Sequence, residues 1–167
     1  MFYSTIIFFF FVVFPGIVNT QEMKVSGTVR CTFDIGGQSF TALLEGAAVE
    51  FWEEDNSLLG DDDDYIGMKT IITKADGQFD HKGDPEEGSA EPFIKVKHQC
   101  YSPSSKNKIT KGHQYVTSVS FEDKRPEQVI LDITVGVVET ARVKYGEDEF
   151  KDIAKDKIKT DTEYINN

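Results

Sequence analysis

The stretch Glu91–Cys100, which reads Glu-Pro-Phe-Ile-Lys-Val-Lys-His-Gln-Cys, decides the fold class that we expect for this chain. Ile94, Val96, His98 and Cys100 fall on one face of an extended segment, and Phe93, Lys95, Lys97 and Gln99 fall on the other. This period-2 alternation predicts a half-buried β-strand whose lysines lie in solvent. Pro92 is compatible with the first residue of a strand. The buried face of the strand therefore ends in a cysteine.

Six further segments are β-prone and are separated by turn residues. They are Lys24–Phe33, Ala47–Glu53, Met68–Thr73, Gln78–His81, His113–Phe121 and Val129–Val137. The alternation places Trp52 on an outward face. Gly36-Gly37 predicts a turn after the first strand, and Asp76-Gly77 predicts a hairpin between Met68–Thr73 and Gln78–His81. Seven short strands predict an all-β fold, an antiparallel β-sandwich of about seven strands.

The N-terminal segment Met1–Val18 is apolar almost throughout and carries no charge. Pro15 and Gly16 interrupt it before a short polar exit, which is typical of a secretory signal peptide, although the usual positively charged start is missing. A transmembrane anchor is the alternative, but it needs about 20 apolar residues. We therefore expect a signal peptide at residues 1–20 with cleavage after Thr20, and a secreted, extracellular protein without stable membrane insertion.

The chain has two cysteines, Cys31 and Cys100. Cys31 shares the phase of Val25, Val29 and Phe33 in the first strand, so both thiols face the expected core. Two cysteines in an exported chain predict one disulfide, which would close a loop of about 70 residues and stabilise the fold by up to about 4 kcal/mol. Two separate buried thiols are the alternative.

The net charge of the chain is −11 at pH 7. Such an acidic chain repels phosphate backbones, so nucleic acid is not an expected partner. After the signal segment about 145 residues remain, enough for one domain with a single core. We expect this domain at residues 21–140, followed by a charged tail at residues 141–167. In the tail Phe150, Ile153 and Ile158 have helical spacing, which predicts a weak amphipathic helix or a disordered segment.

The ordered set of strand sequences resembles the nematode transthyretin-like family over roughly Lys24–Glu139. The segments that carry the resemblance are Val25-Ser26-Gly27-Thr28-Val29-Arg30-Cys31, Val49-Glu50-Phe51-Trp52-Glu53-Glu54-Asp55, the acidic loop with Asp61–Asp64, Thr73-Lys74-Ala75-Asp76-Gly77-Gln78-Phe79, and Glu91–Cys100. The resemblance implies a secreted transthyretin- or prealbumin-like β-sandwich with a binding or bridging role. Some members of that family are described as extracellular adaptors that recognise lipid on dying cells.

The chain departs from the family pattern in its cysteines. Many members carry a third cysteine shortly after the one that matches Cys100 and a fourth near the end, whereas neither Tyr101–Lys111 nor the tail has one here. The joint absence of the third and the fourth cysteine is the pattern expected when one disulfide-bonded pair is lost. The resemblance therefore favours pairing of Cys31 with Cys100.

An enzymatic relative of transthyretin hydrolyses 5-hydroxyisourate. It has a C-terminal Tyr-Arg-Gly-Ser motif and conserved His and Arg residues in a channel between subunits. This chain ends in Thr162-Glu163-Tyr164-Ile165-Asn166-Asn167, and its arginines are Arg30, Arg125 and Arg142. The nucleophile elbow, Walker loop and dinucleotide fingerprint are also absent from the sequence. We therefore expect no catalytic residues and no cofactor, and the hydrolase is the less favoured alternative.

The histidines His81, His98 and His113 show no zinc-binding spacing, so we expect no metal site there. His98 has the inward phase, which predicts a hydrogen-bonded structural histidine; a role in ligand recognition or pH response is the alternative. The acidic segment from Glu53 to Asp64 matches no EF-hand, and we expect a solvated loop with at most weak Ca²⁺ binding.

These observations predict a secreted, non-catalytic binding protein that acts in the extracellular region or at a cell surface. Its expected partner is a lipid, a small apolar ligand or an extracellular protein. A secreted protein–protein interaction or host-modulating factor is the alternative.

Overall fold

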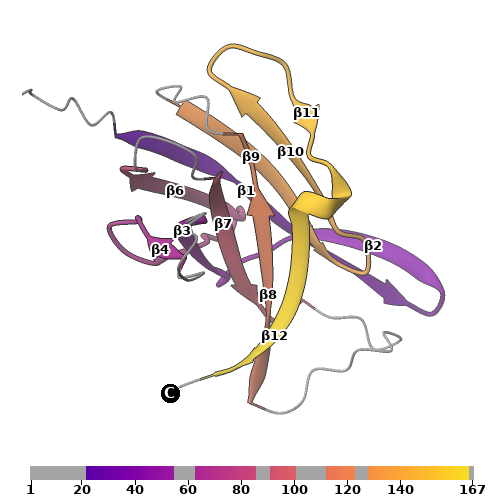
Figure 1. The fold of residues 1–167 in the computed structure, drawn as a ribbon. Coiled ribbons are helices and arrows are strands. Elements are labelled where there is room, and N and C mark those ends of the chain that lie inside the picture. The colour runs from indigo at the N-terminus through magenta and orange to yellow at the C-terminus, as the bar shows by residue number, and fades with distance from the viewer. Residues whose placement is uncertain (1–21, 55–62, 86–90, 101–111, 123–127, 166–167) are drawn as a thin grey trace, which may run out of the picture.

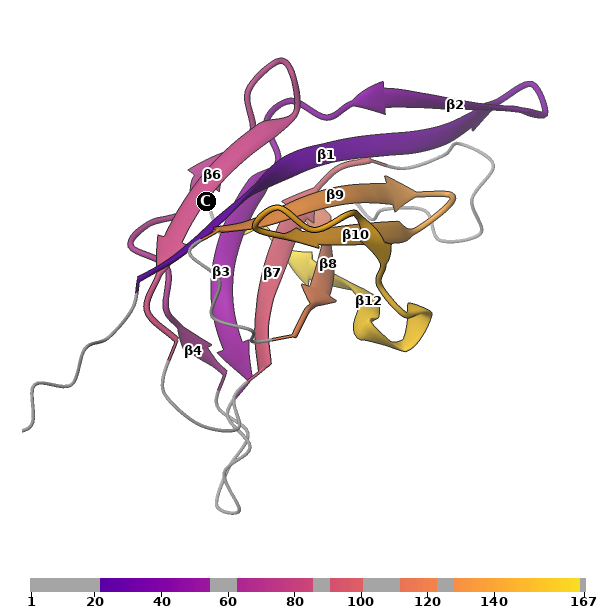
Figure 2. The same ribbon diagram turned by 90° about the horizontal axis from the view of Figure 1, so that it is seen from above.

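Two β-sheets pack face to face in this protein (Figures 1 and 2). The computed structural model describes residues 22–54, 63–85, 91–100, 112–122 and 128–165. Its strands are β1 (Met23–Ile35), β2 (Gln38–Leu43), β3 (Ala48–Glu54), β4 (Asp64–Tyr65), β5 (Ile71–Ile72), β6 (Gln78–Gly83), β7 (Glu91–His98), β8 (His113–Ser120), β9 (Gln128–Gly136), β10 (Thr140–Tyr145), β11 (Lys151–Asp152) and β12 (Ile158–Tyr164). The described residues also hold one 3₁₀ turn, η1 (Lys155–Lys157), and no α-helix. The predicted all-β sandwich is confirmed, with more strands than the seven expected.

The two sheets differ in strand direction. The first sheet has the order β11-β10-β9-β1-β2, and β6 also pairs with β1. β1 runs parallel to β9, which corrects the expectation of a purely antiparallel sandwich. A parallel pair requires a crossover, and here the chain visits the second sheet between these two strands. That second sheet has the order β12-β8-β7-β3-β4, with β5 also on β3, and all its pairs are antiparallel.

Apolar side chains from both sheets meet in one core. Each strand contributes alternate residues because neighbouring side chains point to opposite faces. The largest fully buried side chains are Phe51, Phe79, Met23, Ile94, Leu131 and Ile133. The ring of Phe51 stacks on Phe121 with centroids 6.3 Å apart and meets His81 edge-on at 5.9 Å. Burying each such side chain contributes about 2–3 kcal/mol, so this core dominates the stability of the sandwich.

Strand β1 has two successive partners along one edge. Its residues Met23–Thr28 pair with β6, and its residues Arg30–Ile35 pair with β2. The change of partner strand from β6 to β2 occurs at Val29. The Val29 N–H donates to the Gly77 carbonyl, and the Val29 carbonyl accepts from the Leu44 N–H, both at 2.9 Å. β1 therefore continues past the end of β6 with β2 as its new neighbour.

The second half of β1 and β2 form a hairpin, residues 30–43, that we call the arm. Gly36 and Gly37, with φ of 59° and 83°, close it, as the Gly-Gly turn predicted. The strand β2 itself was not expected, because all six of its side chains are exposed and carry no burial alternation. Figure 2 shows the arm extending beyond the strands of the second sheet.

The turn at Asp76-Gly77 forms, but its flanking strands do not make the expected hairpin. β5 pairs with β3 in the second sheet, whereas β6 pairs with β1 in the first. Thr73 lies where the chain crosses from the second sheet to the first. Its hydroxyl donates to the Leu44 carbonyl at 2.6 Å and accepts the Ala47 N–H at 2.9 Å, which fixes the chain at this point. Gly77 has a φ of 69°. This turn therefore carries the chain from one sheet to the other.

The C-terminal segment is part of the sandwich. β10 places Ala141, Val143 and Tyr145 in the core, so the sandwich continues past the boundary expected at residue 140. β11 then pairs with β10, and β12 pairs with β8. The expected tail helix is not formed, because Ile153 and Ile158 pack against the core from an extended chain. In Figure 1 the yellow β12 lies along β8 and covers that edge of the second sheet.

Several expectations concern residues outside the described ranges. The expected signal peptide at residues 1–20 lies there, as do Asp61, Asp62, Tyr101–Lys111 and Arg125. Within the described ranges, no helix has the length and apolar character needed to cross a membrane.

Candidate binding groove

A disulfide joins the two sheets at the base of the arm. Cys31 in β1 and Cys100, two residues after β7, are linked by an S–S bond of 2.04 Å with their Cα atoms 5.6 Å apart. Both residues are buried, so the pairing predicted from the strand phases is confirmed. A core disulfide is typical of proteins that mature in an oxidising compartment.

Gly136 lets the end of β9 pass close to this disulfide. A Cβ at this position would lie 2.6 Å from the Cys100 sulfur and 2.2 Å from the Thr32 carbonyl oxygen. Its φ of 106° also lies in the region that favours glycine. The sequence analysis did not single out Gly136, although it lies inside the alternating segment Val129–Val137, where a glycine can mark the close approach of another backbone.

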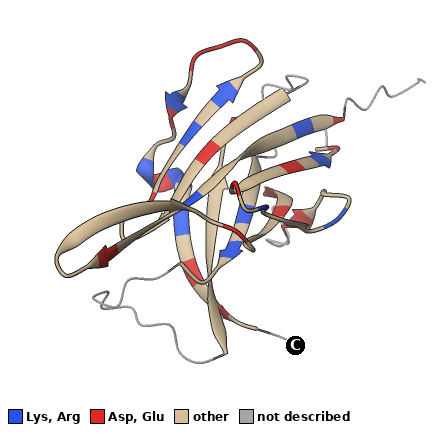
Figure 3. Ribbon diagram, turned by 180° about the vertical axis from the view of Figure 1, so that it is seen from behind, with Lys and Arg blue, Asp and Glu red and all other residues tan. Residues whose placement is uncertain are grey.

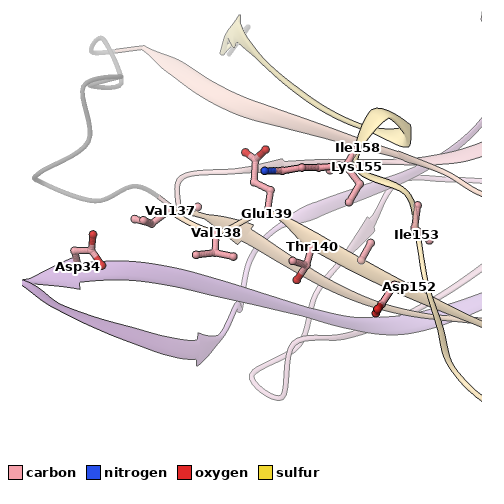
Figure 4. Close-up of a pocket in the computed structure, with 11 residues that line it drawn as sticks. Asp34, Val137, Val138, Glu139, Thr140, Asp152, Ile153, Lys155 and Ile158 are labelled. Atoms are coloured by element: carbon pink, nitrogen blue, oxygen red, sulfur yellow. The ribbon is translucent and has the colours of Figure 1, made fainter.

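A groove opens at the end of the sandwich next to Gly136, with a volume of about 840 Å³ (Figure 4). We call it the end groove. Its apolar lining is Val137, Val138, Ala141, Ile153 and Ile158. The β9–β10 turn supplies one wall, and the segment from β11 to β12 supplies the other. The N–H of Ile153 donates to the Ala141 carbonyl at 2.9 Å, which fixes the second wall against β10.

Charged side chains surround this aliphatic lining. They are Asp34 from the arm, Glu139, Asp152 and Lys155. Three carboxylates against one ammonium give the rim a net negative charge. Among the described lining residues, the one hydroxyl is that of Thr140, and there is no cysteine, histidine or serine. The groove therefore combines an aliphatic wall with a charged, mainly acidic rim.

A smaller groove of about 330 Å³ lies next to the end groove. The two share Asp152 and Ile153, so the segment between β11 and η1 separates them. Phe121, Val143 and Tyr145 form the aromatic and aliphatic part of the smaller groove. The C-terminal segment, where the sequence predicted no site, thus contributes to both.

His98 belongs to a buried polar network behind the disulfide. The Cys100 N–H donates to its Nδ1 at 3.2 Å, so Nε2 carries the ring proton and donates to the Thr117 hydroxyl at 3.0 Å. Thr117 in turn shares a hydrogen bond of 2.9 Å with Thr160 of β12. Burial lowers the pKa of His98 to about 4, so the imidazole is neutral at pH 7. The predicted hydrogen-bonded structural histidine is confirmed.

The other two histidines lie apart from His98. His81 is buried in the first sheet, its Nδ1 accepts the Lys82 N–H at 3.0 Å, and burial lowers its pKa. The ring of His113 packs edge-on against Tyr164 with centroids 5.3 Å apart. The described residues contain no group of three or more His, Cys, Asp or Glu side chains arranged to hold a metal ion.

Two of the arginines share one carboxylate. Arg30 of β1 and Arg142 of β10 both form salt bridges with Asp132 of β9, which lies between these strands. Neither arginine lines the end groove.

The outward face of the second sheet carries an aromatic and charged cluster. Lys95 Nζ lies 3.9 Å from the centroid of Trp52 and 3.1 Å from a carboxylate oxygen of Asp63. The indole N–H of Trp52 donates to Glu50 at 3.0 Å, and Glu50 also accepts from Lys97 at 3.1 Å. Burial alone would lower the pKa of Lys97, but the hydrogen bond and charge of Glu50 raise it overall. The predicted outward position of Trp52 is confirmed, and its neighbours are paired with one another.

The chain forms an all-β sandwich with one inter-sheet disulfide and, at one end, a groove lined by aliphatic and charged side chains. Comparison of the chain with protein-family models, curated proteins and solved structures finds no match. The similarity to transthyretin-like proteins therefore stays a prediction from the strand sequences.

Proposed function

We propose that the protein is a secreted, non-catalytic binding protein that holds a small apolar ligand or a lipid acyl chain in the end groove. One observation carries this proposal: aliphatic side chains line an open groove, and Val137 and Val138 are 42% and 49% exposed at its mouth. Covering such surface contributes about 25 cal/mol per Å². A volume of about 840 Å³ lies within the range of small-molecule pockets.

Three features support an extracellular place of action. The apolar segment Met1–Val18 is typical of a signal peptide. The Cys31–Cys100 disulfide fits export, since disulfides persist in oxidising compartments. The similarity to nematode transthyretin-like proteins also implies secretion and a binding role.

The charge of the rim restricts the ligand. Asp34, Glu139 and Asp152 outnumber Lys155, and the whole chain carries a net charge of −11. An anionic headgroup at the mouth would meet this negative potential, so we expect neutral or cationic amphiphiles to bind more tightly than anionic ones.

The test uses a fluorescent fatty amine and a fluorescent fatty acid as probes, titrated with the disulfide-intact mature protein. We expect saturable binding of the amine, and weaker binding of the acid. Val138→Asn should weaken binding of the amine at least tenfold by placing an uncharged polar amide on the aliphatic wall without adding a charge that attracts the amine. Ile72→Asn is the matched control, because Ile72 is 57% exposed on β5 and does not line the groove.

Two results would contradict the proposal. One is the absence of saturable binding of either probe, together with no association with phosphatidylcholine vesicles. The other is an equal loss of binding in the Val138 and Ile72 variants, which would show that the site lies elsewhere.

A secreted protein–protein interaction factor is the second candidate. Ile35, Phe40 and Leu43 on the arm are exposed by 59%, 44% and 50%, which is apolar surface that a protein partner would cover. Capture of a defined partner from extracellular fluid, lost on Phe40→Asp and retained on Val138→Asn, would favour this candidate over the groove.

A further inference from the structure

Strand β2 forms one edge of the first sheet in the described part of the chain. Among the described residues it pairs with β1 alone. The Leu44 N–H bonds to the Val29 carbonyl, and alternate pairs of an antiparallel ladder exchange hydrogen bonds. Cys31–Ala42 and Phe33–Phe40 are therefore hydrogen-bonded pairs. Ser39, Thr41 and Leu43 consequently direct their N–H and C=O groups away from β1, where another strand could pair with them.

The composition of β2 sets it apart from the other edges. Its sequence, Gln-Ser-Phe-Thr-Ala-Leu, contains no charge and no proline. Proteins normally protect exposed edges with charges, with prolines or by keeping the strand very short. The other edge strands of the described chain follow that rule: β4, β5 and β11 have two residues each, β6 carries Asp80 and Lys82, and β12 carries Lys159, Asp161 and Glu163.

We propose that two copies of this chain pair antiparallel through β2 and form one continuous sheet across the dimer. With the two-fold axis at Thr41, Thr41 faces Thr41 of the second copy. Ser39 then faces Leu43 of the second copy, and Leu43 faces its Ser39. Each of these pairs exchanges two backbone hydrogen bonds, so one register satisfies every outward-directed group of β2.

A second copy fits this edge better than a charged partner strand. The proposed register is self-complementary, which a two-fold interface requires. At the proposed interface the residues that face each other are uncharged. This favours pairing, because the net charge of −11 makes two copies of the protein repel each other elsewhere. Figure 3 shows the arm largely free of charged residues and projecting from the charged body, so the two bodies stay apart. Within each copy, Asp34 of β1 pairs with Ser39 and Arg30 of β1 pairs with Leu43. Across the dimer, Asp34 and Ser39 of one copy therefore lie in line with Leu43 and Arg30 of the second copy. The two ends of this line of residues carry opposite charges.

Substitution of Thr41 tests the use of its backbone N–H. Thr41→Pro removes an N–H that the β1–β2 ladder does not use, whereas Thr41→Ala keeps it. Both variants lose the hydroxyl contact with Thr32, 3.1 Å long, so they form a matched pair. Sedimentation equilibrium should show a dimer for the wild type and for Thr41→Ala. Thr41→Pro should raise the dimer dissociation constant at least tenfold, with unchanged circular dichroism.

Introduced cysteines test the register independently of the proline variant. Thr41→Cys should form an intermolecular disulfide under mild oxidation, because the two positions face each other across the axis. Ser39→Cys should not, because it faces Leu43 of the second copy. Peptide mapping must show that the Cys31–Cys100 bond is intact in both variants.

A monomeric wild type at the highest soluble concentration would overturn the proposal. So would a dimer that is unaffected by Thr41→Pro, or equal cross-linking of the two cysteine variants. Binding of the fatty amine is measured on the same samples, so a failure of the dimer is distinguishable from a failure of the proposed groove.

Discussion

Acidification should destabilise this fold through His98. Both ring nitrogens are committed: Nδ1 accepts the Cys100 N–H, and Nε2 donates to Thr117. A proton added at Nδ1 would face the Cys100 N–H and abolish that hydrogen bond. Burial disfavours the charged ring as well, and it lowers the pKa of His98 to about 4.

The size of the effect follows from this pKa. In the unfolded chain the imidazole has its ordinary pKa of 6.5, so the unfolded state binds the proton first as the pH falls. The stabilisation is therefore fully present above pH 6.5 and is lost as the pH drops towards 4. The shift from 6.5 to about 4 corresponds to about 3 kcal/mol. That is a large fraction of the 5–15 kcal/mol typical of a domain, and the lowered pKa of His81 acts in the same direction.

Urea unfolding measures this loss directly. The free energy of unfolding, followed by Trp52 fluorescence, is determined at several pH values between about 7.5 and 4.5 for the wild type and for His98→Gln. Glutamine keeps a donor for Thr117 but does not titrate. We expect the wild type to lose up to about 3 kcal/mol more than the variant over this interval. Carboxylates and His81 titrate in both proteins, so the difference between the two curves isolates His98.

Two observations would refute the reasoning about His98. One is a pair of parallel stability curves for the wild type and His98→Gln. The other is an NMR titration in which the His98 ring protonates near pH 6.5 in the folded protein, or shows its proton on Nδ1 at neutral pH.

Three further predictions concern the surroundings of the disulfide. The double variant Cys31→Ala/Cys100→Ala should lower the free energy of unfolding by about 4 kcal/mol at most, measured by urea unfolding against the wild type; no change would contradict a constraining role. Gly136→Ala should lower the thermal midpoint strongly, because its Cβ would lie 2.2 Å from a β1 carbonyl oxygen, and an unchanged midpoint would contradict the close packing. Thr117→Val should cost about 1–3 kcal/mol by leaving the buried N–H of His98 without an acceptor, and a neutral result in urea would argue against the inferred tautomer.

The alternating strands could be predicted from the sequence because their environment is periodic. In β7 and β9 each inward residue meets the same core, so hydrophobicity alone reveals the phase. The same phase placed Cys31, Cys100 and His98 inside and Trp52 outside. These predictions needed only the direction of each side chain and no knowledge of which strands are neighbours.

The remaining features depend on partners far away in the sequence. The tail reads as a charged segment with helical spacing at Phe150, Ile153 and Ile158. It is extended instead, and its last part, β12, becomes a strand because β8 presents an edge to it. β5 and β6 read as one hairpin, and Thr73 directs them to different sheets. The end groove combines side chains from the arm, the β9–β10 turn and the C-terminal segment, which no local pattern brings together.

The parallel pairing of β1 with β9 has a consequence for biosynthesis. β1 is synthesised first, but it pairs with β9, which is synthesised much later: Lys24 pairs with Gln128, and Thr32 pairs with Gly136. The first sheet can therefore form only after β9 has been synthesised. Such late, long-range pairing slows folding and leaves the early strands unprotected in the meantime. The nascent chain is thus most vulnerable to aggregation between the synthesis of β2 and that of β9, and a chaperone that shields extended apolar segments would act in that interval.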